Sequence, residues 1–549
     1  MTSDKLYDLC VIGSGPAGII TVLEYNRINP QKTILLIEYG FSGQPERNNL
    51  DDSIDVKNPE NHHNPYNCTN KGLGGTSLTW GGRCVMFDDI DFMKRPLIDE
   101  NCTWDLNFFE EVKPHTSKAA EYFECGEPIF DLNQIADFKN TTIAENFEDG
   151  YVTDKNVERW SMPTRFGKRY RKDLEKAENI KILEGYQAQK FGELDENGKT
   201  GSITIRNVRS NELCDAQAKN FVIAAGTQES TRLLLKNKHL FKKLEQVPTA
   251  LGKFYQCHLL GKIASVIFNG DPKKTDFGFL RNQDGTYMRR RLQLTTQYLK
   301  DNDLLNTVLW LDNPLYYDPK HKNGAMSFMY LAMLIPFLGK KLAPPAIAHS
   351  ITKGKTIGVR KHLWNLSKDL PGSLVTPAKI FYKRYLIKRK LPGIFLFSPL
   401  NKYALYFHSE QLPVFENRME LSKDEEKLNI YYDFADKDID SVIKTHQAID
   451  KYLRDINCGR LEYWYKEEDL PRVIREISMD GVHQIGTTRI ADSPKDGVVD
   501  RNLKVYGTEN VFVCSSSVFP TSGQANPTFF LGACAIRLAN YLKKEDEEN

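Results

Sequence analysis

Short, nearly continuous apolar runs that end at glycine turns mark the beginning of this chain. Residues 7–13 (YDLCVIG) have the pattern of a strand that is buried on both faces of a parallel sheet. The glycine turn 13–18 follows, and then IITVLEYNRI (19–28), which indicates a helix. A second apolar run, TILLIE, ends at Glu38, 20 residues after Gly18. The pattern therefore predicts a strand, a turn, a helix and a second strand.

Two further runs of the same kind lie far downstream. FVIAAGTQESTRLLLKN (221–237) is a buried strand that ends in Ala-Gly and continues as a helix. NVFVCSS (510–516) leads through a Pro/Gly-rich loop to Asn526-Pro527 and a closing helix. Between them, residues 403–434 alternate apolar and polar positions, which predicts a half-solvated antiparallel sheet.

These runs predict one α/β nucleotide-binding domain that is assembled from separated segments. Its predicted segments are 1–95, 166–260 and 480–549. The antiparallel substrate domain is predicted to occupy 96–165 and 261–479. A chain of 549 residues is long enough for two such domains.

The first turn has glycines at the spacing that a dinucleotide needs. Gly13 allows the tight turn, Gly15 lets a pyrophosphate approach the backbone, and Gly18 lets helix and strand pack closely. Glu38 is placed to hold a ribose hydroxyl. The helix N-terminus adds free N–H groups. At this point both FAD and NAD are open.

A second glycine stretch, KGLGGTSLTWGGRCVMFDDIDF (71–92), has five glycines between Gly72 and Gly82. Glycine has no Cβ, so such backbone can wrap a flat, anionic cofactor at close range. Near the C-terminus, His483 stands in GVHQIGTTRI (481–490), beside a glycine and two threonines. A lone histidine has no assigned chemistry until other segments supply a reason.

Composition narrows the function class. The 40% hydrophobic and 27% charged residues are those of a globular protein, and a net charge of +2 gives no general attraction to nucleic acid. The ten cysteines have no metal-ligand spacing, so no metal site is predicted. No secretion signal and no bilayer-length apolar run are visible, so we expect a cytoplasmic protein.

Four motifs in order, GSGPAG, LGGTS, HQIGTTR and ANPT, resemble the glucose–methanol–choline (GMC) flavoprotein oxidoreductases. The resemblance covers about half of the chain and is most similar to the sugar-oxidising branch that includes the pyranose oxidases. It implies an FAD cofactor and oxidation of an alcohol to a carbonyl. By the same resemblance His483 is the base and Asn526 its partner beside the flavin, although Asn526 is also a plausible helix cap.

The resemblance also implies the residues that contact the cofactor. Besides the glycines and Glu38 named above, the predicted set is Pro16, Ala17, Gly74, Gly75, Thr76, Thr79, Trp80, Gly81, Ala225, Gly226, Ser516, Pro527 and Thr528. One position departs from the pyranose oxidases. There a histidine before the tryptophan is bonded covalently to the flavin, whereas this chain has Thr79. We therefore expect noncovalent FAD.

The substrate is less constrained than the cofactor. A sugar or glycoside hydroxyl is favoured, with a sterol or fatty alcohol as the alternative. A flavin-containing lyase of the same fold and a flavin-binding protein without turnover also stay open. His408 and Glu410 are the candidate substrate residues, and the electron acceptor is unknown.

One insertion, residues 325–391, is not explained by the resemblance. AMSFMYLAMLIPFLG (325–339) is apolar but too short to span a bilayer. From Gly339 to Leu391 there are thirteen Lys or Arg residues against one acid, Asp369. Three interpretations stay open: a buried helix beside a solvated basic face, a peripheral contact with anionic lipid, and an oligomer interface.

Overall fold

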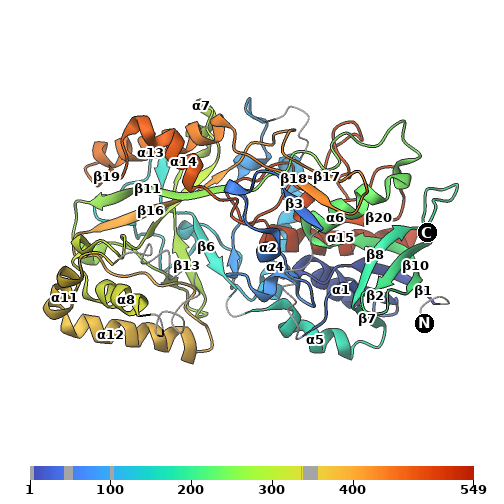
Figure 1. The fold of residues 1–549 in the computed structure, drawn as a ribbon, viewed down its shortest axis with the longest axis horizontal. Coiled ribbons are helices and arrows are strands. Elements are labelled where there is room, and N and C mark those ends of the chain that lie inside the picture. Colours follow the sequence, from blue (N-terminus) through green and yellow to red (C-terminus); the bar gives the residue numbers. More distant parts are fainter. Residues whose placement is uncertain are drawn as a thin grey trace.

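The computed structural model describes residues 5–42, 53–98, 104–161, 164–335, 337 and 356–548. Figure 1 shows two lobes side by side, and both termini lie on the same lobe. Part of the insertion, residues 338–355, lies outside the described ranges. None of the helices in the described ranges has the length and apolar character that crossing a membrane requires.

The lobe with the termini is built on a seven-stranded sheet in the order β7-β2-β1-β10-β9-β8, with β20 paired to β10. The strands from β7 to β10 and β20 are parallel, and β8 and β9 extend the sheet in antiparallel fashion. Their bounds are β1 (Leu6–Ile12), β2 (Ile34–Glu38), β7 (Ile180–Glu184), β8 (Tyr186–Phe191), β9 (Ser202–Asn207), β10 (Leu213–Ile223) and β20 (Val511–Val513). The four predicted apolar strands thus meet in one sheet.

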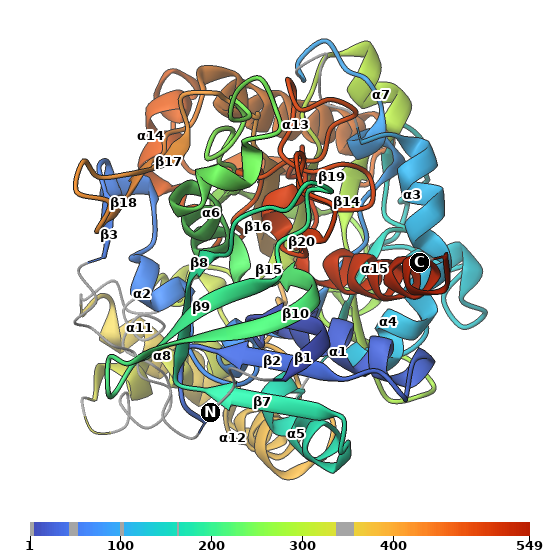
Figure 2. The ribbon, with the colours of Figure 1, turned by 90° about the vertical axis from the view of Figure 1, so that its right-hand side faces the viewer.

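Helices from distant parts of the chain cover this sheet. Figure 2 looks onto this lobe and shows α1 and α15 beside the strands. These two helices pack together, and α4 packs on α15. The bounds are α1 (Pro16–Ile28), α2 (Pro65–Cys68), α3 (Leu106–Val112), α4 (Thr116–Phe123), α5 (Phe166–Lys176), α6 (Gly226–Lys236) and α15 (Thr528–Glu548). The first and last segments of the chain therefore share one core.

The other lobe contains a six-stranded antiparallel sheet in the order β19-β11-β16-β15-β14-β5. Helices α13 and α14 pack on it. The bounds are β5 (Val152–Thr153), β11 (His258–Phe268), β14 (Leu292–Leu294), β15 (Thr307–Asp312), β16 (Lys402–Glu410), β19 (Gly459–Tyr463), α7 (Thr296–Asp301), α13 (Asp436–Asp455) and α14 (Leu470–Ile477). The α/β and antiparallel parts of the predicted fold class are both confirmed, whereas the domain boundaries stay a prediction.

The alternating stretch 403–434 differs from its prediction in two ways. Strand β16 is buried along almost its whole length, because it is central between β11 and β15 and α13 packs on it. A half-solvated strand is therefore the wrong description of it. The remaining strands, β17 (Arg418–Leu421) and β18 (Leu428–Tyr431), leave this sheet and pair with β3 (Ile54–Val56) in a separate one.

A small sheet and a group of helices complete the second lobe. The small sheet has the order β12-β13-β6-β4. Its strands are β4 (Arg83–Cys84), β6 (Val157–Trp160), β12 (Leu280–Arg281) and β13 (Tyr287–Arg290). The chain between β15 and β16 contains α8 (Gly324–Leu334), α11 (Val359–Lys368) and α12 (Leu370–Phe381), which lie together at the end of the molecule away from the termini (Figure 1).

Candidate active site

The first glycine turn is shaped for a close approach of backbone and ligand. Gly13 has a φ of +102°, and a Cβ there would lie 2.5 Å from the carbonyl oxygen of Ala224. At Gly18 a Cβ would lie 2.0 Å from the carbonyl oxygen of Gly13, so both positions require glycine. At Gly15, which precedes α1, a Cβ would meet nothing within 4 Å. The open space therefore lies at the residue that was predicted to face a pyrophosphate.

The N-terminus of α1 suits an anion. Pro16 is the first residue of the helix, Ala17 is buried, and no side chain caps the helix at Gly15. No acidic residue lies in the first turn. The N–H groups and the positive end of the helix dipole are thus available to a phosphate, and the turn fits a dinucleotide.

Glu38 joins the two glycine segments. Its Oε2 accepts hydrogen bonds from Ser14 N (3.1 Å) and Ser14 Oγ (2.5 Å), and its Oε1 accepts from Gly72 N and Gly40 N, both at 2.8 Å. A carboxylate has further lone pairs, so a ribose hydroxyl is compatible with these bonds. The ribose role of Glu38 stays a prediction.

The second glycine stretch lies directly against the first. Gly74 N donates to Ser14 O at 2.8 Å, and a Cβ on Gly75 would lie 2.9 Å from Gly15 Cα. The LGGTS segment therefore closes over the turn at Gly15. Thr76, within this segment, is exposed.

The residues after this segment differ in their surroundings. Thr79 is exposed, and its Oγ1 accepts a bond from Asn70 Nδ2 at 2.6 Å. Trp80 is held by a hydrogen bond from its Nε1 to Thr164 O (2.9 Å). A Cβ on Gly81 would meet nothing within 4 Å. Thr79 offers no atom for the covalent bond that histidine makes in the pyranose-oxidase pattern.

The end of β10 is joined to the loop that contains His483. Gly226 begins α6 after Ala225, with a φ of +74° and open space where a Cβ would be. Thr227 Oγ1 and Ser516 Oγ each donate to Gln484 O at 2.7 Å. Ser516 thus positions Gln484, the residue next to His483, and its hydroxyl also lies 3.2 Å from the hydroxyl of Thr227 in the first turn of α6.

His483 and Asn526 come together although 43 positions separate them. Asn526 Nδ2 lies 2.7 Å from His483 Nε2, and Asn526 lies two residues before the start of α15 at Thr528. The carbonyl of Pro527 accepts the helical bond from Leu531 N. With the amide donating to Nε2, the lone pair of His483 is on Nε2 and its proton is on Nδ1.

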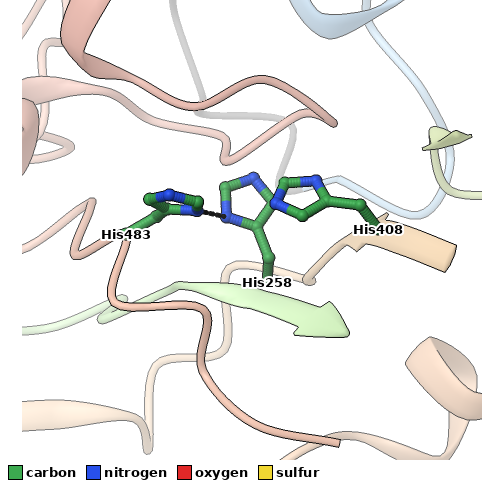
Figure 3. A group of neighbouring side chains, drawn as sticks. All are labelled: His258, His408 and His483. Atoms are coloured by element: carbon green, nitrogen blue, oxygen red, sulfur yellow. Dashed lines mark hydrogen bonds between the residues drawn. The ribbon is translucent and has the colours of Figure 1, made fainter. Parts of the chain in front are cut away.

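A third residue, His258, fixes this tautomer. Figure 3 shows the ring of His483 pointing at that of His258, with 3.2 Å between the two Nδ1 atoms. Since Nδ1 of His483 carries the proton, it donates the hydrogen bond, and Nδ1 of His258 is the acceptor. In this tautomer the nitrogen of His483 that faces Asn526 is unprotonated, which is the state that a general base requires.

The loop before His483 is strained and firmly anchored. Val482 has a φ of +57°, a conformation that is rare for a β-branched residue and costs about 1–3 kcal/mol. Asp480 accepts from Val482 N at 3.2 Å and is itself paired with His63. The carboxylate thus supports the strained turn, and the direction of the His483 ring is set by the fold.

All three imidazoles are neutral at neutral pH. Burial first, and the positive charge of Arg83 second, lower the pKa of His258 to about 3. Burial, the neighbouring His258 and Arg83 likewise hold the pKa values of His408 and His483 well below 6.5. His483 is therefore present as free base.

The predicted substrate residues have different positions. His408 stacks on His258 with 4.2 Å between ring centroids, so it joins the histidine group. Glu410 is instead held in a buried bidentate pair with Arg95, two bonds of 2.7 Å, and also accepts from Asn306 N. Both oxygens of Glu410 have protein partners. The sequence did not indicate His258, because a single histidine at the start of a strand has no motif around it.

The three histidines also raise the question of a metal ion, since their nitrogens lie within 4.8 Å of one another. Metal ligands direct their lone pairs at one point. His258 and His408 instead present ring faces to each other, with 29° between the planes. Arg83 adds a positive charge close enough to lower all three pKa values. The three rings therefore lack the convergent geometry of a metal site.

Residues 413–535 match the family model described as GMC oxidoreductase. The chain carries the C-terminal domain of the GMC oxidoreductases. The predicted resemblance is thereby confirmed, and this GMC domain includes both His483 and Asn526.

Curated relatives match the chain only locally. A 2-methyl-1,2-propanediol dehydrogenase of Mycolicibacterium austroafricanum is 34% identical over 64 residues, which is 12% of either chain. A dehydrogenase of Strobilurus tenacellus is 35% identical over 77 residues, 14% of this chain and 12% of the relative. The matched segments thus span about an eighth of the relatives' length.

Solved structures match over the whole chain at low identity. A fungal aryl-alcohol oxidase has a TM-score of 0.52 at 14% identity, covering 98% of this chain and 99% of its own. Pyridoxine 4-oxidase of Mesorbium loti has a TM-score of 0.52 at 15% identity, with 97% and 99% covered. Formate oxidase of Aspergillus oryzae has a TM-score of 0.51 at 13% identity, with both chains fully covered. The protein shares their fold.

Proposed function

We propose that this protein is an FAD-dependent oxidoreductase that converts an alcohol to a carbonyl. The observation that carries the proposal is the 2.7 Å contact between His483 Nε2 and Asn526 Nδ2. The glycine cradle around Gly15 supports the cofactor, and the flavoenzymes that share the fold support its identity as FAD. Because Thr79 stands where the linking histidine would be, we propose that FAD is bound noncovalently.

The two side chains divide the work on the substrate hydroxyl. A hydroxyl that enters between them donates its hydrogen bond to His483 Nε2 and accepts one from Asn526 Nδ2. The O–H proton then moves to Nε2 while the C–H bond gives up its electron pair, leaving a C=O bond. FAD, when bound, supplies the acceptor for the hydride.

A polyhydroxylated substrate, a sugar or a glycoside, is the class that we favour. Among the described residues, His258 Nε2 and both ring nitrogens of His408 are buried without a hydrogen bond of normal geometry, and the two rings interact only weakly with the backbone of Ser522, Gly523 and Gln524. Buried polar atoms are normally satisfied, and leaving one unsatisfied costs about 1–3 kcal/mol. Neighbouring hydroxyl groups of one sugar would supply such partners.

The alternative is a sterol or fatty alcohol. Its support is the insertion between β15 and β16, where Leu363, Trp364 and Leu374 are more than half exposed. The chain passes from the insertion into strand β16, and β16 contains His408, so the insertion leads directly to the histidine group.

The test is anaerobic mixing of the yellow holoprotein with a pyranose, a methyl pyranoside, a long-chain alcohol and a sterol. We expect the sugars to bleach the flavin absorbance. Bleaching by the apolar alcohols alone would select the alternative substrate. Cleavage of a cyanohydrin without bleaching by any alcohol would show a lyase and contradict the proposal.

A further inference from the structure

The helices of the insertion have their polar side inward. On α11, His362 and Asn365 are buried and contact Ser327 of α8, at 3.0 Å and 3.2 Å. On α12, Ser373 is buried. Helix α8 packs against both helices and is mostly buried, so the first part of the apolar run, residues 325–334, belongs to the core.

Large apolar side chains are exposed, among exposed cations, on α11, on α12 and on the helical turn Tyr382–Leu386 that follows α12. We define the insert face by its exposed large side chains: Leu363 (53% exposed), Trp364 (61%), Leu370 (57%), Leu374 (61%), Val375 (48%), Tyr382 (56%) and Leu386 (67%). A helix on the surface of a globular protein normally shows the reverse pattern, with its apolar stripe toward the core. A group of large exposed apolar side chains on one segment indicates a contact surface.

The insert face is also strongly basic. Residues 356–391 contain nine Lys or Arg residues and one acid. That acid, Asp369, accepts from Gly372 N and caps α12. Arg389 donates to Glu124 O, and its charge contributes to the lowered pKa of the Glu124 carboxyl. Within the described ranges, no carboxylate forms an ion pair with the other eight cations, which are Arg360, Lys361, Lys368, Lys379, Lys383, Arg384, Lys388 and Lys390.

We propose that the insert face binds peripherally to a bilayer that contains anionic lipid. Apolar side chains would enter the interface between headgroups and acyl chains, while the lysines and arginines meet the phosphates. A second copy of this chain is a poorer partner. A two-fold interface would place one set of nine cations against another, and like charges oppose that contact.

The insert face does not coincide with the apolar run from which the sequence predicted a contact. The sequence suggested the contact for the run 325–339, but residues 325–334 pack inside as α8, and of the described residues of the run only Ile335 and Phe337, beyond the end of α8, are strongly exposed. The residues of the insert face come from α11, α12 and the helical turn Tyr382–Leu386 that follows α12. This proposal concerns membrane binding and is independent of the alcohol chemistry, because lipid binding is measured without turnover.

Flotation of the holoprotein tests the proposal. Vesicles of phosphatidylcholine with phosphatidylglycerol should carry the protein upward, and vesicles of phosphatidylcholine alone should carry much less. At about 1 M salt, where the Debye length is about 3 Å, binding should fall. Replacing one cation, as in Lys361→Ala or Lys368→Ala, should lower the partition coefficient about fivefold.

A pair of variants distinguishes vesicle binding through the insert face from nonspecific hydrophobic adsorption. Trp364→Ser together with Leu374→Ser should lower binding more than tenfold, since each removes a large apolar group from the contact. Leu213→Ser is the control, because Leu213 is 65% exposed but lies on β10 in the other lobe. Equal flotation of the two variants would overturn the proposal.

Trp364 supplies a second measurement, which is made on the unmodified protein. It is the only tryptophan among the large exposed side chains of the described ranges. Brominated lipid should quench its emission, and Trp364→Phe should abolish the quenched component. Failure to bind anionic vesicles at low salt would refute lipid binding. So would a concentration-dependent dimer that Trp364→Ser abolishes while vesicles leave the emission unchanged.

Discussion

The role of His258 gives the most specific prediction about the site. His258→Leu keeps the volume of the side chain but removes the acceptor at 3.2 Å from His483 Nδ1. A donor left unsatisfied in a buried position costs about 1–3 kcal/mol. If this cost falls on the tautomer and ring orientation in which Nε2 is poised as the base, less of His483 is competent and the rate of flavin reduction drops roughly 5- to 150-fold.

The pH dependence has a definite direction. Burial is the first cause of the low pKa of His483, and His258 is the second. Removing His258 raises the pKa of His483 toward its ordinary value, so more of the base is protonated at a given acidic pH. The acidic limb of the rate profile should therefore move to higher pH.

Stopped-flow reduction of the flavin, measured across pH without oxygen, checks both effects. His258→Asn is the matched rescue, because its Oδ1 can accept where Nδ1 did. His446→Leu is the control, since His446 is also buried but its ring packs on Phe407. The reasoning fails if His258→Leu keeps the normal rate and pH limb, or if His258→Asn is as slow as His258→Leu.

Three further predictions concern cofactor and fold. Gly15→Val should fold, because a Cβ there meets nothing within 4 Å, but should be purified without yellow colour; full flavin content would contradict the cradle. Acid precipitation should release the flavin into the supernatant because Thr79 cannot form the covalent bond, and colour in the pellet would contradict noncovalent binding. Glu410→Gln should lower the free energy of unfolding by about 3–5 kcal/mol, since it breaks the buried pair with Arg95; unchanged denaturant unfolding would show that the pair contributes nothing.

The parts of the fold that depend on local pattern were predictable from the sequence. The strand ending at Ile12, the turn at Gly13 and the strand ending at Glu38 follow from continuous apolar runs and glycine spacing. Such runs indicate strands buried on both faces, and the sheet buries them. The proximity of His483 and Asn526 followed from the motif resemblance, because nothing local relates residues 43 positions apart.

The remainder depends on tertiary packing. His258 gains its role only when β11 and β16 pair, which stacks it on His408. Likewise, Trp364 and Leu374 have ordinary places in the sequences of α11 and α12. They become a surface because polar contacts to Ser327 turn the other side of α11 inward. Sequence periodicity does not say which side of a helix meets the core.

The central claim is that His483 takes the proton of an alcohol whose hydride goes to the flavin, and His483→Ala tests it most directly. The variant should bind FAD with an unchanged spectrum, while anaerobic reduction by the substrate slows roughly 10²–10⁴-fold, the usual contribution of a general acid–base group. Asn526→Ala should slow it less and mainly weaken substrate binding. A His483→Ala variant that reduces its flavin at the normal rate would show that the base lies elsewhere.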